Sequence, residues 1–189
     1  MNQKLTLYFI GLLFAFNLNA KTYTYESIPN DPLKTRIYKL DNGLTVFLTQ
    51  NKTKPRIHSF IATKAGSSYD PSDNTGLAHY LEHMLFKGSY KYGTQDWEKE
   101  KGYIQAISDL YEKHKAEQNP SLKKDIYRQI DSLSYIASGI AIPNEFDKMM
   151  AAMGTKGVNA FTSFDQTVYT EDIPSNQLER WAKVESERM

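Results

Sequence analysis

Residues 76–88 read GLAHYLEHMLFKG, a stretch in which apolar side chains recur at helical spacing. The recurring apolar positions are Leu77, Leu81, Met84 and Leu85. This spacing predicts a helix, and its apolar content leads us to expect that the helix is well buried. Three residues that precede it offer side-chain oxygens to the free backbone N–H groups of its first turn: Asp73, Asn74 and Thr75.

In the same helix, His79 and His83 lie four residues apart, so both imidazoles project from one face and can bind one cation. Glu82 is close enough to take a proton from a metal-bound water without being a ligand itself. Zinc accepts imidazole and carboxylate ligands and lowers the pKa of a bound water toward ~7, which provides a nucleophile for amide hydrolysis. The motif therefore predicts one Zn²⁺ per site. Iron or manganese would accept the same ligands, and a hydrogen-bonded pair of core histidines is the structural alternative.

The composition excludes several classes of function. Lys and Arg number 23 and Asp and Glu number 22, so no strong positive field favours nucleic acid, and we expect none as a partner. Cysteine is absent, which excludes disulfides, thiolate metal ligands and a lipid-modified cysteine. Any metal site must use His and carboxylate ligands.

The N-terminus has the pattern of a signal peptide. Lys4 precedes an apolar run from Leu5 to Phe16, and Ala20 is small enough for a signal-peptidase cut. We therefore expect residues 1–20 to be removed and the protein to be exported, either to the periplasm or to the medium. An uncleaved membrane anchor is the alternative, but the apolar run is shorter than the roughly 20 residues that a spanning helix needs. We expect no stable membrane anchor after cleavage.

Three β-prone runs precede the motif helix. Residues 36–40 and 44–49 flank Asn42-Gly43, a pair that readily takes the positive φ angles of a tight hairpin turn. Residues 56–64 are rich in apolar and β-branched side chains and predict a third strand.

A charged helical segment follows the motif helix. Residues 96–118 carry apolar side chains on one face, and residues 122–133 repeat this pattern after Asn119-Pro120. The pattern predicts a helical hairpin within an insertion that spans about residues 96–142. A structural excursion on the domain surface is favoured over a dedicated binding device, because charged solvent faces are common.

The remaining sequence predicts helix, strand, strand and helix. A short helix is expected over residues 143–153, and residues 158–163 and 167–172 are strand candidates. The last helix, from Pro174 to Met189, carries three residues that we expect to face the core: Leu178, Trp181 and Val184. It ends without a capping residue, so we expect the natural polypeptide to continue.

Four segments in this order resemble the insulinase or pitrilysin family of zinc peptidases, whose motif is His-x-x-Glu-His. They are LDNGLTVFL (40–48), AGSSYD (65–70), TGLAHYLEHMLFKGS (75–89) and VNAFTSFDQTVY (158–169). The resemblance covers most of residues 35–189. It implies an α+β domain of the mitochondrial-processing-peptidase-like type, in which a sheet packs against helices. Residues 21–189 would be an N-terminal metallopeptidase domain, incomplete at its C-terminal end, and a second homologous domain or subunit would complete the enzyme around a peptide or an unfolded polypeptide.

The resemblance also implies the roles of the motif residues. His79 and His83 match the family's first two zinc ligands, and Glu82 matches its catalytic base. The third ligand of the family is a glutamate on a later helix, and we expect it beyond Met189. Three glutamates within the chain are the other candidates: Glu179, Glu185 and Glu187.

A second region is implied to bind substrate. Asn159 and Ala160 match the strand that pairs with an extended substrate peptide in this family, a mode that binds many sequences through the backbone. Phe161 is expected either to line the adjoining pocket or to occupy a core position.

The sequence thus predicts a zinc-dependent endopeptidase, although residues 21–189 alone are expected to bind zinc weakly and to be inactive. A non-catalytic partner subunit of the same family is one alternative, which the intact motif argues against. S-ribosylhomocysteine lyase shares the motif, but its metal site uses a cysteine and it is not exported.

Overall fold

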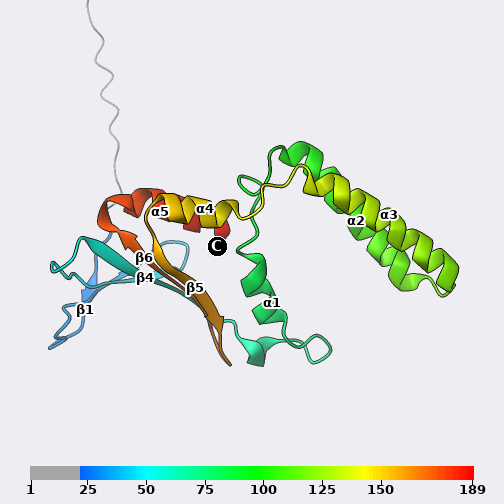
Figure 1. Cartoon of the computed structure of the whole chain (residues 1–189). Coiled ribbons are helices and arrows are strands. Elements are labelled where there is room, and N and C mark those ends of the chain that lie inside the picture. The colour runs from blue at the N-terminus through cyan, green and yellow to red at the C-terminus, as the bar shows by residue number, and fades with distance from the viewer. Residues whose placement is uncertain (1–21) are drawn as a thin grey trace, which may run out of the picture. The chain divides into compact units, whose positions relative to one another are not determined.

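The computed structural model describes residues 22–189 (Figure 1). It separates into two compact units, one that ends at Thr53 and one that extends from Lys54 to Met189. The predicted signal peptide lies outside the described residues. Among those residues, no helix combines the length and the apolar character that crossing a membrane requires.

The first unit is a small antiparallel sheet in the order β1-β2-β3. Its strands are β1 (Glu26–Ser27), β2 (Arg36–Lys39) and β3 (Thr45–Leu48). The register pairs Arg36 with Leu48, so the predicted hairpin is confirmed. Only Gly43 of the Asn-Gly pair takes a positive φ, of 89°, while the Asn42 side chain accepts a hydrogen bond from Leu44 N at 3.1 Å.

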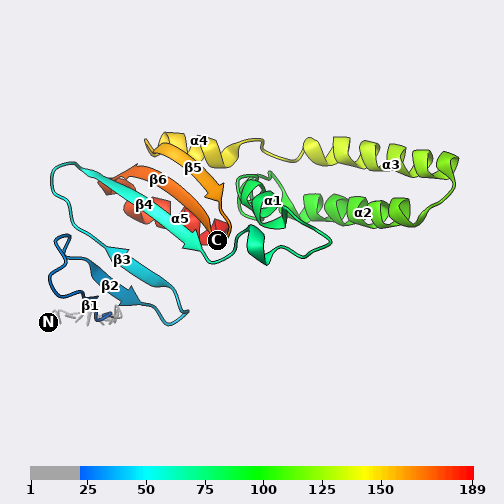
Figure 2. The ribbon, with the colours of Figure 1, turned by 90° about the horizontal axis from the view of Figure 1, so that it is seen from below.

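The second unit is built on an antiparallel sheet in the order β4-β6-β5 (Figure 2). Its strands are β4 (Arg56–Thr63), β5 (Lys156–Thr162) and β6 (Thr167–Pro174). All three were predicted, with bounds that differ by at most two residues. The central strand, β6, is the most buried because it has a strand on each side, whereas β5 pairs only with β6.

Two helices form the core with this sheet: α4 (Glu145–Ala152) and α5 (Leu178–Arg188). The buried apolar side chains that join them are Phe146, Met150, Met153 and Val184. Trp181 packs against this cluster as expected, but Leu178 does not, since it is 47% exposed. Leu178 is the first residue of α5, directly after the 3-10 helix η2 (Ser175–Gln177), where the helix has not yet reached the core cluster.

The predicted helical hairpin is confirmed as α2 (Trp97–Ala116) and α3 (Pro120–Ser138), which pack along each other. Asn119 caps α3, because its Oδ1 accepts hydrogen bonds from the first backbone N–H groups of the helix. Ile130 of α3 is 1% exposed, so this helix has a buried apolar side chain of its own. Thr94 pairs with Ala141 at the base of the hairpin, so the ends of this segment lie together.

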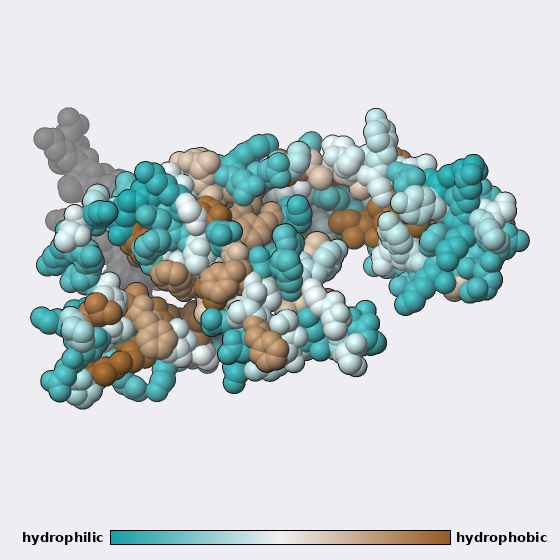
Figure 3. Space-filling view, turned by 60° about the horizontal axis from the view of Figure 1, so that its bottom comes forward, coloured by the Kyte–Doolittle hydropathy of each residue, from teal (hydrophilic) through white to brown (hydrophobic). Residues whose placement is uncertain are grey.

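The motif helix is α1 (Leu77–Met84), and the expectation that it is well buried was wrong. Glu82 is its only buried residue, and Tyr80 is 63% exposed. Its apolar residues Leu77, Leu81 and Met84 are among the large apolar side chains that are exposed. Figure 3 shows one face of the molecular surface, coloured by hydropathy. The physical reason is that no described element covers the outer side of α1. The α+β fold class, with a sheet packed against helices, is nevertheless confirmed.

Candidate functional site

Helix α1 begins at a cap that differs from the predicted one. The N-cap residue is Gly76, which takes the left-handed conformation with φ 88°. A glycine has no side chain that could cap the helix. Instead, Asp70 accepts hydrogen bonds from Gly76 N at 2.7 Å and from Ala78 N at 2.8 Å. The residues Asp73, Asn74 and Thr75 do not perform this role, because the loop folds back and brings the earlier carboxylate to the helix start.

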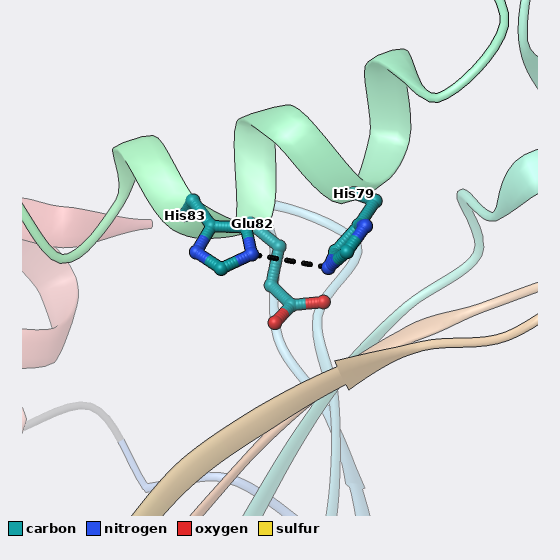
Figure 4. A group of neighbouring side chains, drawn as sticks. All are labelled: His79, Glu82 and His83. Atoms are coloured by element: carbon teal, nitrogen blue, oxygen red, sulfur yellow. Dashed lines mark hydrogen bonds between the residues drawn. The ribbon is translucent and has the colours of Figure 1, made fainter.

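The helix gathers three side chains, which we call the His–Glu–His group: His79, Glu82 and His83. One potential ligand atom from each lies within 4.8 Å of the others. The two imidazoles are exposed and face each other, and the Glu82 carboxylate lies beneath them on the side of the sheet (Figure 4). Glu82 is only 7% exposed. The group thus combines two open nitrogen donors with one sheltered carboxylate.

The geometry of the two imidazoles fits a zinc ion. Their Nε2 atoms are 3.0 Å apart. Two nitrogens that ligate zinc at 2.0–2.1 Å with tetrahedral angles lie about 3.3 Å apart, so a small rotation of either ring would reach that separation. Neutral imidazoles are also the donors that zinc prefers besides thiolates. His79 and His83 can therefore hold such an ion, with Glu82 close beside it.

The Glu82 carboxylate is fixed by a strand residue that is distant in sequence. Thr162 donates its hydroxyl hydrogen to Glu82 Oε2 at 2.5 Å. The Thr162 hydroxyl also lies 3.3 Å from that of Thr167, which donates to the carbonyl oxygen of Ala65 at 2.7 Å. The base candidate on α1 is thereby tied to the ends of β5 and β6.

The predicted substrate-binding residues lie on β5, which is an edge strand of the described sheet. Ala160 pairs with Tyr169 and Asn159 with Thr170, and a register irregularity precedes Asn159. Phe161 is 49% exposed, so its side chain does not lie in the core that the described residues form. Because side chains alternate along a strand, Phe161 faces away from the side on which Thr162 meets Glu82.

The three glutamates considered as a third ligand lie in other interactions. Glu179 is exposed and pairs with Lys183 at 2.9 Å. Glu187 forms an ion pair with Lys91, which lowers the pKa of its carboxyl. Glu185 is buried in an ion cluster on α5. The structure brings none of them into the His–Glu–His group.

The ion cluster is centred on Arg188, which is 6% exposed. Its Nη2 donates to Glu171 at 2.9 Å and to Glu185 at 2.5 Å, and Trp181 Nε1 donates to the other oxygen of Glu171 at 2.7 Å. The guanidinium carbon lies 4.5 to 5.0 Å from three ring centroids, those of Phe86, Phe146 and Tyr169. Since Phe86 follows α1, the cluster connects the motif segment with α4, α5 and β6.

The cluster carries two carboxylates for one guanidinium, and this imbalance affects Glu185. The pKa of Glu185 is raised to about 7, because burial and the charge of Glu171 together outweigh the opposing effect of Arg188. Among the described residues, Glu185 Oε1 and Arg188 Nη1 are buried without a hydrogen-bond partner. Burial also raises the pKa of the neighbouring Tyr169; Arg188 opposes this shift and the charge of Glu82 adds to it.

Sequence reasoning missed Asp70, Thr162 and Arg188. Asp70 and Thr162 stand in quoted segments, the AGSSYD loop and the VNAFTS strand, but neither spacing indicated which groups they would contact. Arg188 is separated from Glu171 by 17 residues, and no local periodicity relates them.

Comparisons with known proteins point to one family. Residues 45–124, which contain the His–Glu–His group, match the family profile described as "Insulinase (Peptidase family M16)". The "Insulin-degrading enzyme homolog" of Dictyostelium discoideum is 44% identical over 64 residues, 34% of this chain and 7% of that protein. The "Probable zinc protease PqqL" of Haemophilus influenzae is 28% identical over 156 residues, 82% of this chain and 12% of that protein.

A solved structure shows the same fold. The crystal structure of pitrilysin aligns with a TM-score of 0.53 at 18% sequence identity, over 88% of this chain and 13% of the pitrilysin chain. The chain therefore spans a small part of the length of the proteins that it matches. The family profile and the sequence relatives agree, and the chain resembles the insulinase family of peptidases.

Proposed function

We propose that this chain provides the metal centre of a zinc-dependent endopeptidase. The similarity to this family of peptidases supports a peptidase function in general. The observation that carries the specific proposal is the His–Glu–His group, in which two imidazole nitrogens 3.0 Å apart face each other beside a buried carboxylate. This is the donor set that a catalytic zinc site needs from one helix.

In this proposal each residue has a distinct role. His79 and His83 would hold the zinc ion, since their Nε2 atoms face each other 3.0 Å apart. When bound, zinc lowers the pKa of a ligated water toward ~7 and so supplies a nucleophile at neutral pH. Glu82 would act as general base: it would accept a proton from the water as the water oxygen adds to the peptide carbonyl carbon, and would give that proton to the amine as the C–N bond breaks. Burial beside the sheet keeps the carboxylate in one place while the imidazoles remain accessible.

The remaining parts of the site are proposed to come from other residues. We place the third zinc ligand beyond Met189, because the three glutamates considered within the chain are occupied elsewhere. A second homologous domain or subunit would then close the site over the substrate. The partners of the chain are in this view a peptide or unfolded polypeptide and that second domain.

We propose that substrate binds along β5. Its outer edge has no strand partner among the described residues, so its backbone groups can pair with an extended peptide. Asn159 and Ala160 supply this edge, and the exposed ring of Phe161 is available to contact a substrate side chain. Backbone pairing of this kind favours unfolded or extended substrates of varied sequence.

We further propose that the protein acts after export. Residues 1–20 have the charge and apolar pattern of a cleavable signal peptide, and zinc-dependent peptidase activity then takes place in the periplasm or outside the cell. Mass spectrometry of the exported protein tests this point, because a mature N-terminus at Lys21 is expected.

The experiment that tests the function uses the complete polypeptide that the reading frame encodes, loaded with zinc. We expect it to cleave internal peptide bonds of internally quenched fluorescent peptides. The activity should be lost when a chelator is added and should return when zinc is added. Glu82→Gln should retain zinc and lower kcat by about 100-fold to 10,000-fold, the usual contribution of a general base. Glu112→Gln on the exposed face of α2 is the matched control and should leave kcat unchanged.

Three results would contradict the proposal at different points. Unchanged turnover in Glu82→Gln would remove the base assignment. Hydrolysis that continues in the presence of a chelator would exclude zinc as the catalytic metal. A zinc-loaded polypeptide that cleaves no peptide would favour a non-catalytic partner subunit.

A further inference from the structure

Thr162 is the side chain through which β5 contacts the proposed base. Its hydroxyl donates to Glu82 Oε2 at 2.5 Å, and the two residues are 80 positions apart in the sequence. Among the described residues, this is the hydrogen bond that holds the Glu82 carboxylate. A carboxylate that is 7% exposed and bound at one oxygen has a defined orientation, with its other oxygen left for a water.

The direction of the Thr162 hydroxyl is itself determined. A threonine hydroxyl has one hydrogen to donate. The Thr167 hydroxyl donates its hydrogen to Ala65 O at 2.7 Å. It can therefore act only as an acceptor toward Thr162, 3.3 Å away, and the shorter bond to Glu82 takes the hydrogen of Thr162.

The backbone fixes the position of this hydroxyl as well. Thr162 and Thr167 are register partners at the end of the β5–β6 hairpin. Ser163 N donates to Gln166 O at 2.8 Å and closes the turn between them. A side chain at the end of a closed hairpin, with the stiff χ1 of a β-branched residue, has little freedom to move.

Thr162 also belongs to the strand on which the proposed substrate residues lie. Ala160 is two residues before it, about 7 Å along the strand and on the same face. A peptide paired with β5 and the carboxylate that serves as base would therefore be held in register by one strand. We infer that Thr162 is a positioning residue, which sets the orientation of Glu82 relative to a peptide bound along β5.

This inference rests on the proposed peptidase function and is tested in the same zinc-loaded polypeptide. Thr162→Val keeps the shape and the β-branch of the side chain but removes the donor. We expect kcat to fall by about 10-fold to 100-fold, the usual effect of losing a residue that hydrogen-bonds to a group at a metal site. KM and zinc content should stay unchanged. Thr162→Ser keeps the donor and should restore kcat to within about threefold of the wild type.

The matched control is Thr63→Val, a threonine at the exposed end of β4 in the same sheet. It should leave kcat unchanged. Equal kcat in Thr162→Val and the wild type would overturn the positioning role and leave the proposed function intact. A fall in kcat that Thr162→Ser fails to restore would also overturn it, because the donor would then not be the cause.

A crystal structure of each zinc-loaded protein provides a readout that does not depend on activity. In Thr162→Val we expect the Glu82 carboxylate to rotate away from its wild-type position, and in Thr162→Ser to keep it. A carboxylate that stays in place in Thr162→Val would overturn the inference even if the wild type cleaves no peptide, the result that would contradict the proposed function.

Discussion

Asp70 Oδ1 accepts a hydrogen bond from the backbone N–H of Ala78 at 2.8 Å, directly before the first histidine of the His–Glu–His group. The other oxygen of the same carboxylate accepts from Gly76 N at 2.7 Å. The first turn of α1 therefore depends on a residue of the preceding loop. Because the helix buries only Glu82, this cap is a large share of what holds its N-terminus.

Removal of this cap should destabilise the protein. Asp70→Ala is expected to lower the free energy of unfolding in urea by about 1 kcal/mol, within the usual range of about 0.5–2 kcal/mol for a lost N-cap. Asp73→Ala removes a carboxylate that the sequence predicted as a cap and that does not cap α1, so it should change stability by less than about 0.5 kcal/mol. An equal loss in both variants would contradict the cap assignment.

The histidines should determine how much zinc the protein binds. Loss of a residue that hydrogen-bonds to a metal ligand typically lowers metal affinity by about 10-fold to 100-fold. His79→Gln or His83→Gln removes a direct ligand, so we expect a larger loss of zinc affinity. Elemental analysis after dialysis measures this. His58→Gln changes an exposed histidine on β4 and should retain the wild-type zinc content. Full occupancy in both motif variants would exclude the site.

Gly66 should not tolerate a side chain. A Cβ atom there would lie 2.5 Å from Ser163 O and 2.6 Å from Gln166 N, both backbone atoms of the β5–β6 turn. Gly66→Ala is therefore expected to lower the free energy of unfolding by about 1–3 kcal/mol, as for other overpacked sites. Gly102 lies in α2 with open space around it, so Gly102→Ala should raise the same quantity by about 0.5–1 kcal/mol. Urea unfolding compares the two, and a stable Gly66→Ala would show that the turn can move.

Glu185 should make stability depend on pH near neutrality. Burial raises the pKa of this carboxyl to about 7 in the folded protein, above its usual value of 4.5. Between these values the folded state binds more protons than the unfolded state, so the contribution of Glu185 to the free energy of unfolding rises as the pH falls from about 8 to about 5. Thermal unfolding at several pH values should show this rise in the wild type and a smaller rise in Glu185→Gln.

The control for this pH dependence is Glu187→Gln. The ion pair with Lys91 lowers the pKa of Glu187, so its stabilising contribution is lost only below the usual range of a glutamate, outside the tested window. This variant should keep the wild-type slope between about pH 5 and pH 8. An unchanged slope in Glu185→Gln would show that another group titrates.

The secondary structure was predictable because its signals are local. The turn at Gly43, the alternating strands of the second sheet and the cap at Asn119 each depend on residues that are near in sequence. The same holds for His79 and His83, whose four-residue spacing within one helix places their rings together. Their arrangement follows from helix geometry alone.

The contacts that complete the site were not predictable in this way. Thr162 reaches Glu82 across 80 residues, and Asp70 replaces the three expected cap residues because its loop folds back. The apolar residues of α1 suggested burial, yet Tyr80 is 63% exposed, since periodicity indicates a face and does not show whether another element covers it. Such features depend on tertiary packing, which a single sequence does not encode in its spacing.

Helix α1 buries a carboxylate and leaves its apolar residues at the surface, so its attachment differs in kind from that of the strands. Little apolar area opposes its local opening, and its backbone amides should exchange with solvent well before those of the central strand β6. A cation that binds only the closed helix adds its own binding free energy to the cost of opening. Binding of an ion to the two histidines would then slow hydrogen exchange in this one short helix. The ion would in this way determine how long its own binding site stays closed.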